Sequence, residues 1–292
     1  MNGKRTVFLA GDSTVQSYDA GKRPQMGWGQ LLYTFFKESG ECKIYNRDIS
    51  LGSHIVTYEM PEIAIENHSL AARSSRSFIE QGRLENIMKV AEPGDFMLVQ
   101  FAHNDAFEAR EERFVPVDKF GEWLKRYSDA CEARGMQCIF VTPVTMRVFG
   151  NLGHCEIAFK EYRDAMLKAA EELNVPCVDL SLKSTELIEK LGPEKARDIY
   201  LFVYQGEYPD TALKDGASDN AHFQENGARN MACIVAKELK AMVGDARVKP
   251  IADMIKDVCE VPAFERKLPK GYLWPDEQSQ AEAAKEEILK RD

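Results

Sequence analysis

The amino-acid sequence predicts an α/β protein whose central sheet is mainly parallel and is covered by helices on both faces. Two observations carry this prediction. Short apolar runs of strand length alternate with longer segments of helical period, and turn residues separate the two. The chain has 292 residues, 44% of them hydrophobic and 10% aromatic, so it can bury the core of one large domain.

The expected elements follow in chain order. Strands are expected at Thr6–Ala10, Ile63–Asn67, Phe96–Phe101, Gln137–Thr142 and Pro176–Leu180. Apolar residues at spacings of three and four predict helices over Trp28–Glu38, Ile79–Ala91, Val117–Arg134, Glu156–Leu173 and Glu225–Val243. The turn residues Pro93-Gly94 and Gly135 precede the third and fourth strands. The result is a repeating strand-helix order.

Residues 1–245 are expected to form this domain, and residues 246–292 a C-terminal extension that packs on the domain or at a subunit boundary. The composition changes after the helix at Glu225–Val243, and the chain ends in a charged segment rich in Ala, Glu and Lys. That segment is expected to be a helix with few apolar positions.

Charge and cysteine usage exclude several classes of protein. A formal net charge of -9 makes nucleic acid an unsuitable partner. The apolar stretch near the N-terminus stops at Gly11, too short for a signal peptide, and no run is long enough for a membrane helix. The seven cysteines form no C-x-x-C pair, which suggests reduced thiols and a cytoplasmic protein. The five histidines form no metal-ligand motif, so no metal site is expected. Self-association into a homo-oligomer is left open.

Ser13 lies in the stretch GDST, directly after the first expected strand. Ligands of open parallel sheets bind at the carboxyl ends of the strands, so this serine stands where chemistry is expected. Taken alone, GDST is weak evidence of catalysis and is better explained as a helix cap, because Asp and Ser in such loops commonly cap a helix.

Three further stretches bear on that choice. In QFAHND, Asn104 follows the most apolar strand, where its amide could reach across the sheet edge or simply form a turn. In SDNAHF, Asp219 and His222 are spaced so that a carboxylate could orient the ring, or so that a helix begins. In NHSLAARSSRSF, small residues at 71 and 72 allow close approach of a ligand to the backbone.

Together these stretches resemble the SGNH/GDSL hydrolase superfamily, and most closely its rhamnogalacturonan acetylesterase-like branch. The resemblance runs from Thr6 to about Val243. It rests on GDSTV, SSRSFIEQGRL at Ser74–Leu84, QFAHND, TPV at Thr142–Val144, GEYPD at Gly206–Asp210 and DNAHFQENGA at Asp219–Ala228. It implies a flavodoxin-like three-layer α/β/α sandwich.

The resemblance also implies the roles of the site residues. Ser13 would attack an ester carbonyl, His222 would accept its proton and Asp219 would orient the imidazole. The oxyanion would be bound by the backbone N–H groups of Ser13 and Ala72 and by the side chain of Asn104. This mechanism requires no cofactor.

Two alanines depart from the family pattern, because relatives usually carry glycine where this chain has Ala72 and Ala102. Gly52 in NRDISLGSH is a competing candidate for the backbone oxyanion donor. If Ala72 is the donor, residues Cys42–Met60 are an insertion near the second strand. The side chains expected to line a saccharide site are those of Arg73, Arg76 and Tyr208.

The favoured function is removal of acetyl groups from plant cell-wall saccharides of the rhamnogalacturonan or pectin type, with imported acetylated oligosaccharides as substrates. One alternative is a lipase or thioesterase of the same superfamily, which would need an apolar trough. Another is a catalytically impaired sugar-binding homologue, suggested by the two alanines. A nucleotide-binding protein is disfavoured because the first turn lacks G-x-G-x-x-G.

Overall fold

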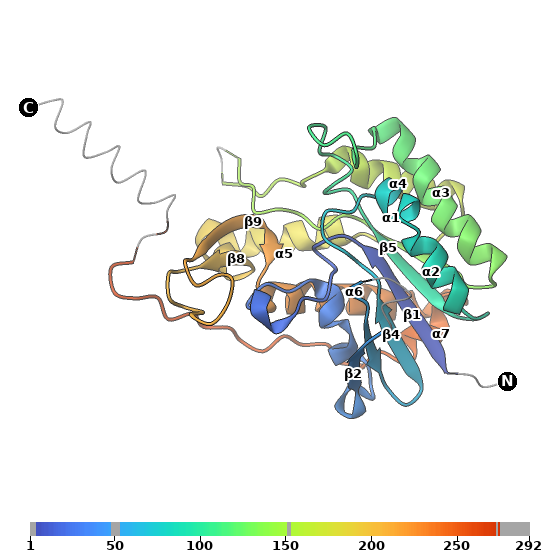
Figure 1. The fold of residues 1–292 in the computed structure, drawn as a ribbon, viewed down its shortest axis with the longest axis horizontal. Coiled ribbons are helices and arrows are strands. Elements are labelled where there is room, and N and C mark those ends of the chain that lie inside the picture. Colours follow the sequence, from blue (N-terminus) through green and yellow to red (C-terminus); the bar gives the residue numbers. More distant parts are fainter. Residues whose placement is uncertain (1–3, 48–52, 151–152, 273, 275–292) are drawn as a thin grey trace, which may run out of the picture.

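The computed structural model describes residues 4–47, 53–150, 153–272 and 274. Its centre is a seven-stranded sheet in the order β2-β3-β4-β1-β5-β6-β7 (Figure 1). Parallel pairing joins β1 (Arg5–Gly11), β4 (Ile63–Asn67), β5 (Phe96–Gln100), β6 (Gln137–Val141) and β7 (Cys177–Val178). At one edge β2 (Lys43–Asn46) and β3 (Val56–Glu59) run antiparallel. The predicted α/β fold with a mainly parallel sheet is confirmed.

Alternate residues of the strands point into two separate hydrophobic cores. On β1, Val7 and Leu9 belong to one core, while Phe8 and Ala10 belong to the other. The second core is covered by α1 (Ser75–Glu80), α2 (Arg83–Val90), α3 (Val117–Ala133) and α4 (Lys160–Glu172). The first is covered by α5 (Leu180–Lys195), α6 (Glu225–Ala241) and α7 (Lys249–Ala252), which lie across the sheet from α3 and α4 (Figure 1). The helices and the sheet therefore make three layers.

The segment Trp28–Glu38 is not the single helix that its period predicts. It forms two 3-10 turns, η2 (Trp28–Gln30) and η3 (Leu32–Phe35). The Trp28 N–H is donated to Thr14 O at 2.8 Å, and a Cβ on Gly29 would lie 2.5 Å from Val15 O. The backbone is thus pressed against the loop after β1, and it bonds to that loop in place of a helical carbonyl.

Two further boundaries differ from expectation. The helix expected over Ile79–Ala91 is divided into α1 and α2, because Gly82 adopts a left-handed φ of 74° between them. The strand expected at Pro176–Leu180 is paired only over Cys177–Val178. Asp179 ends it by capping α5, since its side chain accepts from Leu182 N at 3.3 Å.

Several elements were not predicted: β2, β3, α5 and a second sheet made of β8 (Tyr200–Val203) and β9 (Ala217–Phe223). The β8–β9 pair is antiparallel and is not joined to the central sheet. Among the residues that the structure describes, the other 3-10 turns are η1 (Ala20–Lys22), η4 (Ser39–Glu41), η6 (Ala196–Asp198) and η7 (Met242–Gly244). The Cys42–Met60 segment supplies β2 and β3 at the sheet edge.

The described part of residues 246–292 packs on the first core. Ile251 and Ile255 are fully buried there, and Ile255 forms a short bridge with Phe36. The charged helix expected at the end of the chain lies outside the described residues, and the boundary at residue 245 stays a prediction. In the described part of the chain, every helix is too short or too polar to cross a membrane.

Candidate active site

The loop after β1 holds Ser13 in a network of buried hydrogen bonds. Asp12 Oδ1 accepts from Thr14 N at 2.9 Å and from Thr14 Oγ1 at 2.8 Å. Gln100, at the end of β5, donates to Thr14 Oγ1 at 2.6 Å and accepts from Trp28 Nε1 at 2.7 Å. Because these partners come from three segments, the Ser13 hydroxyl is held at the carboxyl edge of the sheet.

Asp219 and His222 approach this loop from β9. His222 Nε2 lies 3.0 Å from Ser13 Oγ, and His222 Nδ1 lies 2.7 Å from Asp219 Oδ2. The other carboxylate oxygen of Asp219 accepts from the backbone N–H groups of Ala221 and His222 at 2.7 and 3.0 Å. The structure therefore brings the three side chains into a serine-histidine-aspartate chain, the arrangement that activates a nucleophilic hydroxyl.

The charges of this chain suit a general base. Burial lowers the pKa of the His222 imidazole, but the hydrogen bond to Asp219 and the charges of Asp219 and Asp12 raise it more, so its pKa lies above the ordinary 6.5. Burial raises the pKa of Asp219, yet the hydrogen bonds it accepts lower it to about 2. Asp219 is therefore ionised throughout the neutral range and favours the imidazolium.

The three expected oxyanion donors lie at this edge. Among the described residues, none accepts a hydrogen bond from the backbone N–H of Ser13 or of Ala72. Asn104 Nδ2 donates to Arg73 O at 3.0 Å, which ties the amide to the loop that carries Ala72. The amide nitrogen has a second N–H, which is available to donate to a ligand. Ala72 has a φ of 63° and Ala102 a φ of 138°, values in the region that favours glycine.

A cleft of about 370 Å³ opens beside His222. It is lined by Gln16, Tyr18, Asp19, Lys22, Gln25, His54, Leu70, Ala71, Arg73 and His222. Arg73 is held by Gln81 Oε1 at 2.9 Å and by Ala71 O at 2.8 Å. Of the expected saccharide-binding residues only Arg73 lines this cleft. Arg76 bonds to Glu111 O, and Tyr208 lines a separate groove with Phe264; Gly52 lies outside the described residues.

The sequence analysis missed two residues that shape the site. Tyr18 donates its hydroxyl to Ser13 O at 2.9 Å, and Gln16 Oε1 accepts from Ala71 N at 2.6 Å. Both side chains fall within the GDST neighbourhood, where their polarity alone resembles that of any surface loop. The residue that the sequence could have pointed to is Gln100, because it is a polar residue in an otherwise apolar strand and its side chain supports the loop that holds Ser13.

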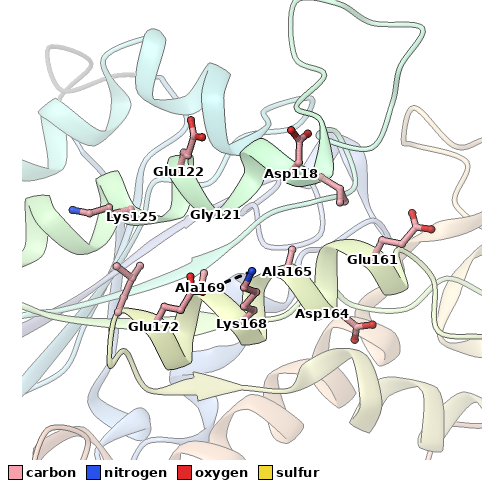
Figure 2. Close-up of a pocket in the computed structure, with 12 residues that line it drawn as sticks. Asp118, Gly121, Glu122, Lys125, Glu161, Asp164, Ala165, Lys168, Ala169 and Glu172 are labelled. Atoms are coloured by element: carbon pink, nitrogen blue, oxygen red, sulfur yellow. Dashed lines mark ion pairs between the residues drawn. The ribbon is translucent and has the colours of Figure 1, made fainter.

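A larger hollow, of about 580 Å³, lies elsewhere, between α3 and α4 (Figure 2). Charged side chains such as Glu122 and Lys125 line its rim, and an ion pair joins Lys168 to Glu172 at 3.7 Å. None of the candidate site residues lines it. Within the described ranges, no three His, Cys, Asp or Glu side chains gather as metal ligands do.

Comparisons with known proteins show which proteins this chain is similar to. The model of the family described as GDSL-like lipase/acylhydrolase matches residues 7–235. The rhamnogalacturonan acetylesterase RhgT of Bacillus subtilis is 34% identical over 81% of this chain and 90% of its own length. YesY of the same organism, described as a probable rhamnogalacturonan acetylesterase, is 33% identical over 81% of this chain and 93% of its own.

Two solved structures share the fold. YxiM of Bacillus subtilis superposes with a TM-score of 0.64 at 26% identity, over 84% of this chain and 58% of the YxiM chain. The acetylxylan esterase Axe2 of Geobacillus stearothermophilus superposes with a TM-score of 0.52 at 16% identity, over 80% of this chain and 93% of the other. The three-layer architecture is therefore common to all three.

Proposed function

Because the chain belongs to the GDSL-like lipase/acylhydrolase family, we propose that it is a carbohydrate O-acetylesterase that works through an acyl-enzyme on Ser13. The observation that carries the proposal is the chain of contacts from Ser13 Oγ through His222 to Asp219, at 3.0 and 2.7 Å. Relatives named as rhamnogalacturonan acetylesterases support the choice of an acetyl ester as substrate.

The reaction has two balanced steps. Ser13 Oγ attacks the acetyl carbon while His222 Nε2 takes the hydroxyl proton, and the tetrahedral intermediate then expels the sugar oxygen, which receives that proton. Water next attacks the acetyl-serine while His222 Nε2 takes a proton from it. The second tetrahedral intermediate then breaks its bond to Ser13 Oγ, which receives that proton from His222, and acetate is released. Asp219 stays ionised and stabilises the imidazolium in both steps.

The oxyanion of each tetrahedral intermediate would be bound by three donors: the N–H groups of Ser13 and Ala72 and the Asn104 amide. Their support is that the two backbone groups make no hydrogen bond to a described residue. A donor that is already in place costs no reorganisation as charge develops, so each one lowers the barrier.

The preferred substrate is an acetylated saccharide of the rhamnogalacturonan or pectin type, which bears carboxylates. The protein carries a net charge of -9, yet Arg73 and Lys22 line its cleft. In the described part of the chain, neither side chain lies within 4.0 Å of a carboxylate. An arginine held by its neighbours suits the planar, two-oxygen geometry of a uronate.

The polar lining of the cleft disfavours the lipase and thioesterase alternatives, because an acyl chain needs a broad apolar trough. We further propose a cytoplasmic enzyme that acts on imported oligosaccharides in pectin breakdown. The seven cysteines, all present as free thiols, suit a reducing compartment. We propose that its binding partner is the saccharide substrate and that it binds neither nucleic acid nor a membrane. Whether copies of the protein associate is a question for experiment.

Acetate release from acetylated pectin, xylan and mannan oligosaccharides tests the function, with Ser13→Ala as the matched control. The wild-type protein should release acetate, with pectin fragments as the preferred substrates. Ser13→Ala should abolish release and leave the fold intact, since the side chain contributes little to either core. Turnover near the wild-type rate in Ser13→Ala would exclude the mechanism. A wild type that binds saccharides without releasing acetate would identify an impaired homologue.

A further inference from the structure

The base and its orienting carboxylate stand on a sheet of two strands only. Asp219 on β9 pairs with Leu201 on β8, and this pair of strands is not joined to the central sheet that carries Ser13. A two-stranded sheet has little stability of its own in water. The distance between His222 and Ser13 therefore depends on the contacts that hold β8 and β9. β9 is held by hydrogen bonds from Met26 N to Phe223 O at 3.1 Å and from Arg147 N to Asn220 O at 2.8 Å, and β8 is held by what packs against it.

A C-terminal strap, defined as residues 258–272 with Trp274, covers β8. Figure 1 shows this part of the chain running along the side of the molecule that holds β8 and β9. Trp274 packs edge-on against Phe202 of β8, with ring centroids 5.3 Å apart and an interplanar angle of 88°. Tyr272 lies 5.8 Å from Tyr204, the residue after β8.

Arg266 of the strap spans the whole of β8. Its Nη1 donates to Phe202 O at 2.6 Å, in the middle of the strand. Its Nε pairs with Asp198 Oδ1 at 3.2 Å, before the strand, and lies 4.0 Å from Glu207 Oε1, beyond it. The Arg266 side chain is only 5% exposed, so its guanidinium is shielded from solvent, whereas the Asp198 side chain is 31% exposed.

We propose that Arg266 is a positioning residue for the reaction. It touches no reacting atom, but by holding β8 it holds β9, and so it sets the contacts of His222 with Ser13 and with Asp219. The inference rests on the proposed function, since it takes these three side chains as the catalytic group. The support comes from outside the segment that matches the family model, which ends at residue 235.

The test compares Arg266→Gln and Arg266→Lys with the full-length wild type, using 4-nitrophenyl acetate well below the unfolding temperature. Arg266→Gln should lower kcat about 10- to 100-fold, the usual effect of a small misplacement of a catalytic group. KM should change little. The acid limb of the pH profile should move to lower pH, because a looser contact with Asp219 raises the pKa of His222 less. Arg266→Lys should recover part of both effects.

Val261→Ala is the matched control, because Val261 belongs to the strap but lines the groove between α5 and α6. It should lower the unfolding temperature and leave kcat and the pH profile unchanged. If Arg266→Gln only lowers the unfolding temperature, with a wild-type kcat and pH profile, Arg266 is structural and the proposal is wrong. If Arg266→Gln does not fold, Arg266→Lys decides in the same way.

Failure of the proposed function would be seen separately, as a wild type that hydrolyses no ester. The imidazole of His222 can then be titrated by nuclear magnetic resonance. A lower pKa in Arg266→Gln or Arg266→Lys than in the wild type would still support the positioning role. An unchanged pKa would overturn it.

Discussion

Ala72 adopts a backbone conformation that costs an L-residue about 1–2 kcal/mol, with a φ of 63°. The resemblance to the hydrolase family implies that glycine is usual at this position, and the positive φ supplies a physical reason for that. Alanine retains the backbone N–H that we propose as an oxyanion donor. The methyl group therefore brings strain without removing the donor.

Replacing Ala72 separates these two effects. Ala72→Gly should preserve the rate of acetate release and raise the free energy of unfolding by up to about 1 kcal/mol through relief of strain. Ala72→Pro should cost about 2.7–4 kcal/mol in the chemical step, because proline has no N–H. Circular dichroism must first establish that the proline variant folds, since its ring disfavours a positive φ.

Gly52, the competing donor, provides the second arm of this experiment. Gly52→Pro should leave acetate release nearly unchanged in a variant that folds. Full activity in folded Ala72→Pro together with loss in Gly52→Pro would assign the oxyanion site to the other loop.

The pH dependence of the rate reports on His222. Its imidazole must be neutral to accept the Ser13 proton, and its pKa is raised, so kcat/KM should fall as the pH drops through an inflection above 6.5. Asp219→Asn removes the charge that raises this pKa. The inflection should then move to lower pH and kcat should fall, less than in His222→Ala. An inflection that does not move in Asp219→Asn would show that Asp219 does not set the pKa of His222.

At the scale of elements, the strands that were predicted are those buried on both faces. β4 and β5 are apolar runs flanked by turns, and all of their residues are buried. β9 gives no such signal, because six of the seven residues of ASDNAHF are partly or fully exposed and its one strand partner among the described residues is β8. Site residues on β9 could be found by motif, whereas their place on a strand required the tertiary contacts.

α6 depends on a close approach that only glycine allows. A Cβ on Gly227 would lie 1.9 Å from Ile199 O, the residue before β8. Gly227→Ala should therefore destabilise the fold by about 1–3 kcal/mol as α6 is pushed outward. Gly244→Ala is the control, since nothing lies within 4 Å of its Cβ, and its free energy of unfolding should stay within about 0.5 kcal/mol of wild type. Denaturant titration measures both, and equal stabilities would contradict the close approach.

For the whole molecule, the parallel sheet and the grouping of Ser13, Asp219 and His222 could be predicted, because strand patterns and motifs are local in the sequence. What could not be predicted depends on distant partners. The Trp28 segment becomes two 3-10 turns by bonding to Thr14, and the β8–β9 sheet is covered by Arg266 of the strap. Contacts of this kind leave no period in the sequence.

Stability of the whole fold should vary with pH through Asp105. Its carboxylate accepts from Ser75 N at 3.0 Å, and burial raises its pKa from 3.8 to about 7. Between these values the folded state binds more protons than the unfolded state, so this group's contribution to stability is greatest below pH 3.8 and is lost as the pH rises to 7. Asp105→Asn should therefore gain stability over wild type more at pH 8 than at pH 5. Thermal unfolding of both proteins at pH 5 and pH 8 measures this. The same stability difference between variant and wild type at the two pH values would contradict the prediction.

The two edge strands of the central sheet, β2 and β7, differ in length and exposure, and this limits how two copies of the protein can pair through their sheets. β7 has two residues, whereas every residue of β2 is exposed and Ile44 is 55% exposed. A lengthening of the central sheet by strand pairing between molecules is therefore expected at β2 rather than at β7, and the exposed Lys43 hinders it by charge repulsion. Crosslinks between β7 segments in a self-associated sample would be the contrary result.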